Sequence, residues 1–363
     1  MSKKVVVWGT GWIAKIAVRT IHDRPDLELI GVWVHSEPGR DGTDAGLLIG
    51  DKPIGVQITN DAERLIGLKP DCILYALNPP KADAVNLPWY ERFLEAGINV
   101  VSTSGANWMF PPACNQDAVK RLEAVAIKGG ASFYVSGLEP GFAADHLALT
   151  LLTLSNTVKS VRTSEIFCYD TSPDEWTQRM FFGFGQTLEY APILMRPGVQ
   201  SRSWGPPIHM VAAAMGVKIE KIRETYDRKL TNRDLEVACG TIKAGTVGAV
   251  RFETIGVVNG RDTIIIEHVN RMAPDIAPEW PTAAKDGTYR IIVEGDPSFR
   301  MDLSIGANSL TAGQEGMIAT AMRVVNAINA ICDAKPGLKT ALDLPMTLPT
   351  SAFRSTMTHA EME

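Results

Sequence analysis

A glycine-rich turn near the start of the chain constrains its fold more than any other sequence feature. It reads Gly9-Thr10-Gly11-Trp12-Ile13-Ala14 and separates an apolar run at 5–8, which predicts a buried strand, from a helical apolar repeat over 13–21. In that position the first glycine permits a tight turn and the second lets a pyrophosphate approach the backbone. The small third residue lets the helix pack closely on the sheet.

The free N–H groups at the start of the helix would then favour a phosphate group. The motif therefore predicts a dinucleotide site in which the cofactor contacts Gly9, Thr10, Gly11, Trp12 and Ile13. The alternative is a tight turn between strand and helix that binds nothing.

Strand-like and helical segments alternate up to about residue 150. Strands are expected at 27–34, 56–59, 71–77, 98–102 and 131–135, and helices at 88–96 and 115–128. Such alternation predicts an α/β domain of the Rossmann type, with a doubly wound parallel sheet that binds ligands beyond the carboxyl ends of its strands. We expect this dinucleotide-binding domain to span residues 1–150.

The pattern changes in the second half of the chain. Apolar residues alternate with polar ones at 250–254, 263–269 and 289–294, which predicts strands of an antiparallel or mixed sheet with one exposed face. The segment 183–216 is rich in Gly, Pro and Met and predicts loops and short helices. We expect an α+β domain for substrate binding and dimerisation at 151–310. A C-terminal helix at 314–333, within a segment 311–363, should pack back on the first domain before an extended tail.

Composition narrows the class of protein. The net charge of −5 and the lack of a basic run argue against nucleic-acid or membrane-surface binding. Every long apolar stretch is interrupted by charge, so no membrane span is expected, and the first residues do not resemble a signal peptide. The five cysteines contain no C-x-x-C pair, and the six histidines show no metal-ligand spacing. These features predict a cytoplasmic protein without a dedicated metal site.

Several motifs together resemble one known family. They are the turn at 9–11, the segments 32–36, 39–41 and 44–46, the loop Ser136-Gly137-Leu138-Glu139-Pro140-Gly141-Phe142, and the segments 182–185 and 320–328. The set is similar to dihydrodipicolinate-reductase-like NAD(P)-dependent oxidoreductases, near 2,4-diaminopentanoate dehydrogenase and the native amine dehydrogenases. The resemblance implies a nicotinamide-dependent oxidoreductase, usually a homodimer, whose second domain carries the substrate pocket.

The chain departs from this family at one position. Amine dehydrogenases of the group resemble one another in carrying a glutamate just after the strand that here ends at Ser102, whereas the segment 103–109 contains no carboxylate. This absence argues against ammonia-dependent amination, unless Glu139 supplies the carboxylate from the neighbouring strand end. The chain also lacks the paired-histidine and lysine signature of true dihydrodipicolinate reductases, which argues against a role in lysine biosynthesis.

Cofactor choice depends on the end of the second strand, His35-Ser36-Glu37-Pro38-Gly39-Arg40. Ser36 and Arg40 could bind a 2′-phosphate, with His35 beside them, which favours NADP(H). The alternative is that Glu37 binds the ribose hydroxyls and Arg40 is a solvated charge, which would favour NAD(H).

Residues after two later strands are expected near the nicotinamide. Asn78 and Pro79 either line the cofactor groove or form a plain strand-ending turn. Ser102, Thr103 and Ser104 either offer hydroxyls to the cofactor or cap the next helix.

Glu139 is the leading catalytic candidate. Its apolar neighbours could desolvate the carboxyl and raise its pKa toward use as a general acid, although the side chain could instead simply face a helix dipole. Asn107 is predicted to donate to a carbonyl or imine, and Tyr169 is a second proton donor. The predicted substrate pocket consists of Leu138, Phe142, Trp176 and Phe184, of which the aromatic residues could equally belong to the core or a dimer interface.

These observations predict an NAD(P)H-dependent oxidoreductase that transfers a hydride between nicotinamide and a C=N or C=O carbon of a small molecule. Two alternatives stay open. One is a ketone/alcohol oxidoreductase that does not use ammonia, and the other is a nucleotide-binding sensor without turnover.

Overall fold

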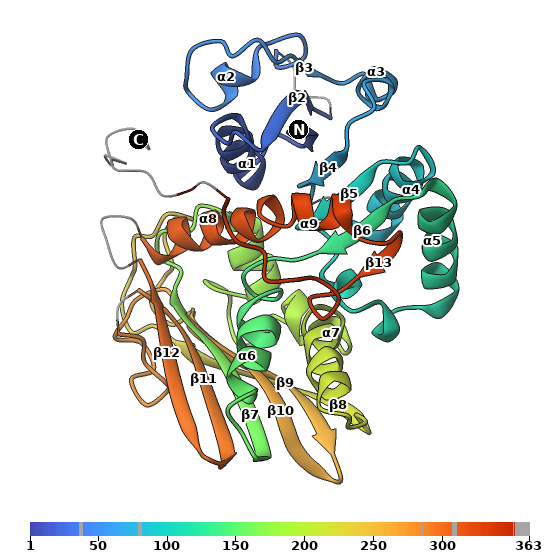
Figure 1. The fold of residues 1–363 in the computed structure, drawn as a ribbon. Helices are drawn as coiled ribbons and strands as arrows, with labels where there is room; N and C mark the ends of the chain where they lie inside the picture. Colours follow the sequence, from blue (N-terminus) through green and yellow to red (C-terminus); the bar gives the residue numbers. More distant parts are fainter. Residues whose placement is uncertain (36–38, 79–81, 285, 307–310, 351, 353–363) are drawn as a thin grey trace. The chain divides into compact units, whose positions relative to one another are not determined.

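The computed structural model describes residues 1–35, 39–78, 82–284, 286–306, 311–350 and 352. Ser36, Glu37 and Pro79 lie outside the described residues. The chain forms two compact units (Figure 1). The first contains 1–105, 117–136 and 320–363, and the second contains 106–116 and 137–319. This division differs from the expected boundary at 150, because residues 137–150 belong to the second unit.

The first unit is built on a seven-stranded sheet in which every pair is parallel. In the order β13-β6-β5-β4-β1-β2-β3, the chain first adds β2 and β3 on one side of β1 and then adds β4, β5 and β6 on its other side. This order confirms the predicted doubly wound topology. Its strands are β1 Lys3–Trp8, β2 Leu27–Trp33, β3 Ile58–Thr59, β4 Cys72–Tyr75, β5 Asn99–Ser102, β6 Ser132–Val135 and β13 Gly337–Lys339.

Helices follow the strands of this unit in the expected alternation. They are α1 Trp12–His22, α2 Ala45–Leu48, α3 Ala62–Gly67, α4 Ala82–Glu95, α5 Gln116–Gly129 and, near the C-terminus, α9 Ile328–Asp333. The apolar sides of α1 and α9 share one core with β1 and β2, through Val18, Val32 and Ile331 among others. The C-terminal helix α9 thus completes the hydrophobic core of the first unit, although it is far from the N-terminus in sequence.

Arg24 ties this C-terminal segment to the N-terminal strands. Its guanidinium is almost fully buried and donates to the Asp26 carboxylate, with Nε 2.9 Å from Oδ1, and to Asn326 Oδ1 at 2.7 Å. Asn329 Nδ2 donates to Asp26 Oδ2 at 2.7 Å. The bonds from Arg24 lower the pKa of Asp26, so the carboxylate is ionised. The carboxylate holds Asn329 of α9, and the guanidinium holds Asn326 between α8 and α9.

The second unit is built on a six-stranded sheet of order β12-β11-β7-β10-β9-β8. The strand β10 runs parallel to β7, whereas the other pairs of neighbouring strands in this sheet are antiparallel. Of the two predicted alternatives, an antiparallel sheet and a mixed sheet, the structure has the mixed one. The strands are β7 Thr157–Cys168, β8 Lys221–Leu230, β9 Val247–Val258, β10 Arg261–Arg271, β11 Gly287–Asp296 and β12 Phe299–Ile305.

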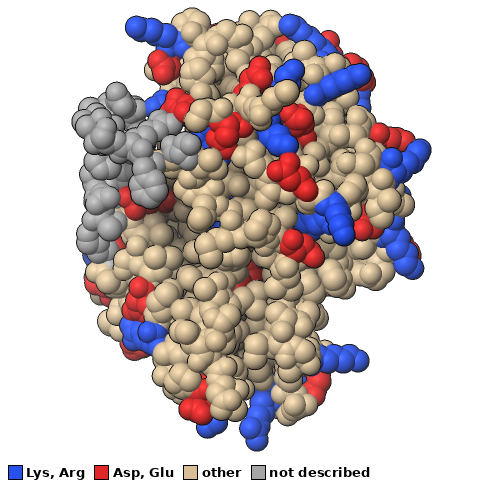
Figure 2. All heavy atoms as spheres, viewed as in Figure 1, with Lys and Arg blue, Asp and Glu red and all other residues tan. Residues whose placement is uncertain are grey.

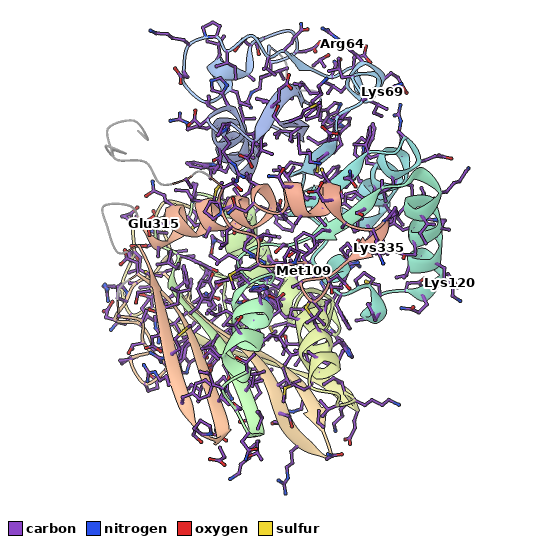
Figure 3. The ribbon with its side chains drawn as sticks, viewed as in Figure 1. Arg64, Lys69, Met109, Lys120, Glu315 and Lys335 are labelled. Carbon is purple, nitrogen blue, oxygen red and sulfur yellow. The ribbon has the colours of Figure 1, made fainter. Side chains whose placement is uncertain are left out.

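Short helical segments, the helix α7 and the first part of the helix α8 complete the second unit. They are η1 Ala106–Met109, η2 Pro111–Ala113, η3 Ala143–Leu147, α6 Ala148–Leu152, η4 Thr177–Phe182, η5 Ile193–Met195, α7 Val199–Ala214 and α8 Ala312–Val325. Figure 3 marks Met109, which is buried in η1, and Glu315 in the first turn of α8. The Glu315 carboxylate accepts a hydrogen bond from the Gly306 amide after β12 (2.8 Å), which ties the helix to the sheet.

Two helical predictions were wrong in detail. The segment 183–216, expected to hold only loops and short helices, contains the 16-residue helix α7 with Pro206 and Pro207 inside it. Both prolines are buried, and the packing of this helix outweighs the lost backbone hydrogen bonds. The single helix expected at 314–333 is divided into α8 and α9, with α8 beginning in the second unit and ending in the first.

Charged side chains of both signs are interspersed over the face shown in Figure 2. No helix in the described part of the chain has the length and apolar character needed to cross a membrane. Within the same residues, no group of three or more His, Cys, Asp or Glu side chains could hold a metal ion.

The Arg24–Asp26 pair generates a stability prediction. Asp26→Ala should lower the free energy of unfolding by about 2–3 kcal/mol, because it leaves a buried guanidinium without its carboxylate. Urea unfolding followed by tryptophan fluorescence measures the change. Glu28→Gln, an exposed change two residues further along the chain on β2, should have almost no effect. Equal stability of Asp26→Ala and wild type would show that the pair does not fasten the C-terminal helices.

Candidate functional site

The glycine-rich turn has the backbone that its sequence predicts. Gly9 has φ of +132°, and a Cβ there would lie 3.1 Å from the Ala76 carbonyl oxygen and 3.2 Å from a Leu77 methyl carbon. A side chain at this position would therefore be strained by the backbone conformation and crowded against the Ala76 carbonyl.

Gly11 differs, because a Cβ added to it would meet nothing within 4 Å. It is the N-cap of α1 and provides no side chain to bond the first amides of the helix. Open space above an uncapped helix N-terminus fits a pyrophosphate, so the residues present are suited to a dinucleotide.

Arg40 lies beside this turn. Its Nη1 donates to the Thr10 carbonyl oxygen at 3.2 Å, and its own carbonyl accepts from Thr43 Oγ1 at 2.6 Å. The loop that carries Arg40 is anchored on β3 by the bond from the Gly42 amide to the Ile58 carbonyl. The structure thus places Arg40 next to the glycine-rich turn, and its role toward a phosphate stays a prediction. His35 is exposed, with its ring edge against Trp33 (centroids 5.8 Å apart).

The serines after β5 form hydrogen bonds within the protein. Ser102 Oγ is 2.9 Å from Tyr90 Oη and accepts from the Ser104 amide at 2.9 Å, while Ser104 Oγ donates to the Leu77 carbonyl. Both serines are buried, and the Ser104 hydroxyl joins the loops after β4 and β5. Thr103 is half-buried beside them, and Asn78 is exposed after β4.

The loop at 136–142 places Glu139 in the second unit. Gly141 has φ of +125°, and a Cβ there would lie 2.1 Å from the Gly137 amide nitrogen, so the two glycines close the loop tightly. Glu139 Oε2 accepts from the Ala144 amide at 3.0 Å, at the start of η3. Its other oxygen, Oε1, is buried and has no hydrogen-bond partner among the described residues.

A second buried carboxylate, Glu165 on β7, accompanies Glu139 and was missed by the sequence reasoning. It is only 6% exposed. Its Oε1 accepts from Tyr169 Oη and, at 3.2 Å, from Asn270 Nδ2. Its Oε2 accepts from Tyr289 Oη at 3.1 Å. One signal in the sequence could have indicated Glu165. It lies among buried residues of a strand, and a tyrosine follows it four positions later.

The two carboxyl groups differ in how their charge is compensated. Burial raises the pKa of Glu139 far above its ordinary value, and the negative charges of Glu165 and Asp145 raise it further. Burial also raises the pKa of Glu165, but three hydrogen bonds to its carboxylate oppose that effect. The pKa values of Tyr169 and Tyr289 are raised by burial and by Glu165, so both remain donors. The arrangement favours an ionised Glu165 beside a protonated Glu139.

The four predicted pocket residues have different surroundings in the structure. Leu138 and Phe142 pack in a small cluster with Phe167 and Tyr289. Phe184 lies fully buried in the main core of the second unit, whereas Trp176 is 61% exposed. For Phe184, this burial favours the alternative of a core residue.

The two remaining catalytic candidates differ in their surroundings. Tyr169 packs against both the small cluster and the main core. Asn107 is half-buried on η1 and belongs to the second unit, whereas the three residues 102–104 belong to the first.

Comparison with known proteins places these features in a family. Residues 142–360 match the family described as the 2,4-diaminopentanoate dehydrogenase C-terminal domain. The chain is 34% identical over 349 residues to an amine dehydrogenase of Streptomyces virginiae, covering 94% of this chain and 96% of that protein. It is 27% identical over 256 residues to the 2,4-diaminopentanoate dehydrogenase of Acetoanaerobium sticklandii, covering 70% and 68%.

The fold is similar to that of a solved structure. The amine dehydrogenase of Mycobacterium smegmatis aligns with a TM-score of 0.77 at 20% identity, over 96% of this chain and 98% of that one. The resemblance read from the sequence motifs is thereby confirmed. The chain belongs to the 2,4-diaminopentanoate dehydrogenase family of NAD(P)-dependent oxidoreductases.

Proposed function

We propose that the protein is an NADP(H)-preferring dehydrogenase that acts on the C=N or C=O carbon of a small organic substrate, with Glu139 as its proton donor. The observation that carries this proposal is the buried Oε1 of Glu139, which has no hydrogen-bond partner among the described residues. An amide N–H can only donate, so Oε2 accepts from Ala144 and the proton of the acid is placed on Oε1.

The residues divide the chemistry among them. When bound, the nicotinamide cofactor gives or takes the hydride. Glu139 Oε1 donates a proton to the substrate nitrogen or oxygen in the reducing direction and takes one back in the oxidising direction. Asn107 is the proposed neutral donor to the same heteroatom. Tyr169 has only one hydroxyl proton, which it donates to Glu165, so we assign it a positioning role instead of proton donation.

Reaction at a C=N carbon is favoured by the relatives named as amine dehydrogenases. Glu139 would replace the carboxylate that is missing from 103–109. The second candidate, ketone/alcohol interconversion without ammonia, is favoured by that missing carboxylate. A homodimer and a cytoplasmic location complete the proposal. The first is supported by the family resemblance and the second by the scattered cysteines.

Gly11→Ala separates cofactor binding from folding. The added methyl meets nothing in the protein, so the unfolding midpoint should not change. It would occupy the space proposed for the pyrophosphate, so the Kd for NADPH should rise about tenfold or more. Calorimetric titration measures the affinity. Gly67→Ala is the matched control, because a Cβ there also meets nothing within 4 Å. Unchanged NADPH affinity in Gly11→Ala would contradict the assignment of this turn to the cofactor.

Arg40→Gln tests the choice between the two cofactors. If the guanidinium binds the 2′-phosphate, the Kd for NADPH should rise about tenfold while the Kd for NADH stays constant. NADH serves as the internal control, because Arg40 also bonds to the Thr10 carbonyl and could support the turn itself. Equal weakening of both cofactors would assign Arg40 to the turn and remove the argument for NADP(H).

Glu139→Gln tests the proton donor. Turnover should fall about 100-fold or more, with NADPH affinity unchanged, because the amide cannot deliver a proton at neutral pH. In the reducing direction, wild-type turnover should decline as pH rises through the raised pKa of Glu139, since the acid form is then lost. The variant should lack this decline. NADPH oxidation with a panel of ketones measures both effects, and Glu294→Gln, an exposed carboxylate on β11, is the control.

The same assay, run with and without ammonium, decides between the candidate reactions. Turnover that requires ammonium supports the amine dehydrogenase, whereas turnover indifferent to it supports the ketone reductase. NADPH binding without turnover on any substrate would instead support the sensor.

A further inference from the structure

We propose that Glu165 is a positioning residue for the proposed reaction, which as a carboxylate held by Tyr169, Tyr289 and Asn270 keeps the proton of Glu139 on Oε1. The catalytic meaning of this inference rests on the proposed function. The protonation pattern itself can be measured without any turnover.

The register of the second sheet fixes two of the three donors. Tyr289 on β11 is directly opposite Glu165 in the antiparallel pair of β7 and β11, and opposed residues share one face of a sheet. On the other side of β7, Glu165 pairs with His268 of β10. Asn270 is two residues further along the same strand and so on the same face. The third donor, Tyr169, follows directly after β7. The Glu165 carboxylate is therefore held by the body of the sheet.

Three hydrogen-bond donors offset the cost of burying a carboxylate charge better than one donor does. Glu165 accepts hydrogen bonds from two hydroxyls and one amide. Glu139 accepts only the bond from the Ala144 amide among those described. When two buried acids interact, the one with more donors carries the charge and the other keeps its proton.

The groups that face Glu139 strengthen this asymmetry. The charged groups acting on it are acidic, namely Glu165 from β7 and Asp145 from η3. The loop that carries Glu139 also packs against the tyrosines that hold Glu165, because Leu138 and Ala143 share one apolar cluster with Tyr289, and Tyr169 packs against that cluster. Ionising Glu139 would therefore add a negative charge beside an existing one in a buried region.

Asn270 gives the cluster a second unsatisfied atom. Its Nδ2 bonds to Glu165, and the opposite orientation of the amide would place a carbonyl against a carboxylate, so the assignment of the two atoms is fixed. Its Oδ1 is buried without a partner among the described residues, as is Glu139 Oε1. Glu165 thus interacts with Glu139, whose protonated Oε1 can still donate, and with Asn270, whose Oδ1 can still accept.

The test is an infrared pH titration of the full-length protein without cofactor. Wild type should show a protonated-carboxyl band that persists to a pH at which ordinary glutamates are ionised, and Glu139→Gln should abolish it. Glu165→Gln should lower the ratio of protonated to ionised Glu139 about tenfold at a given pH, because the neighbouring charge is gone. The alkaline decline of turnover should move to lower pH in the same variant.

Glu267→Gln is the matched control. Glu267 is an equally buried glutamate of the same sheet, bonded to Arg251 and Ser164. Its substitution should affect stability and leave the Glu139 titration unchanged. A Glu139 band that titrates identically in Glu165→Gln and wild type would overturn the inference.

A third spectrum keeps the inference testable if Glu165→Gln does not fold. In Glu139→Gln, Glu165 should be ionised at neutral pH, and a protonated Glu165 would overturn the assignment. Because these readouts need no substrate, a protein that never turns over would refute the proposed function alone. Normal turnover with an unshifted titration would refute this inference alone.

Discussion

The hydrogen bonds of one buried carboxyl group, that of Glu165, connect β7, β10 and β11 of the second unit. A carboxylate removed from water is destabilised by several kcal/mol unless hydrogen bonds replace its hydration. Here the replacements come from β10, β11 and the residue after β7, so they exist only when three neighbouring strands are paired in the observed register. A one-residue slip of either pairing would turn a donor to the other face. The register of the sheet and the charge state of the proposed acid are therefore coupled.

In the first unit, the proposed phosphate site depends on the backbone instead of on a buried charge. A phosphate-binding turn needs exposed amides and no side chain in the way. Gly9 supplies the conformation that the turn requires, and Gly11 leaves the space above it open. The bonds of Ser102 and Ser104 hold the adjoining loops without reaching outward. Close backbone approach also shapes the loop of Glu139, through Gly137 and Gly141. In both units glycine determines where functional groups can lie.

Local patterns explain which features could be predicted from the sequence. The glycine turn, the parallel sheet and Glu139 are each encoded within a few neighbouring residues. Glu165 was missed because its partners Asn270 and Tyr289 lie 105 and 124 positions away. The same limit applies to the parallel pairing of β7 with β10. It applies also to α7, where long-range packing outweighs two prolines whose local preference argues against a helix. Phe184 was assigned to a pocket wall because aromatic side chains suit cores and pockets equally.

The charge balance of the carboxyl pair bears on which reaction it suits. When Glu139 gives up its proton, the buried pair carries two negative charges instead of one. An imine nitrogen that takes the proton becomes an iminium cation, which offsets the new charge until the hydride neutralises it, whereas a ketone that takes a proton and a hydride together becomes a neutral alcohol with no cationic stage. Proton transfer from Glu139 is therefore easier toward nitrogen than toward oxygen. The missing carboxylate after β5 argues against amine chemistry only if no other acid can serve, and a second acid placed beside a fixed negative charge removes that objection.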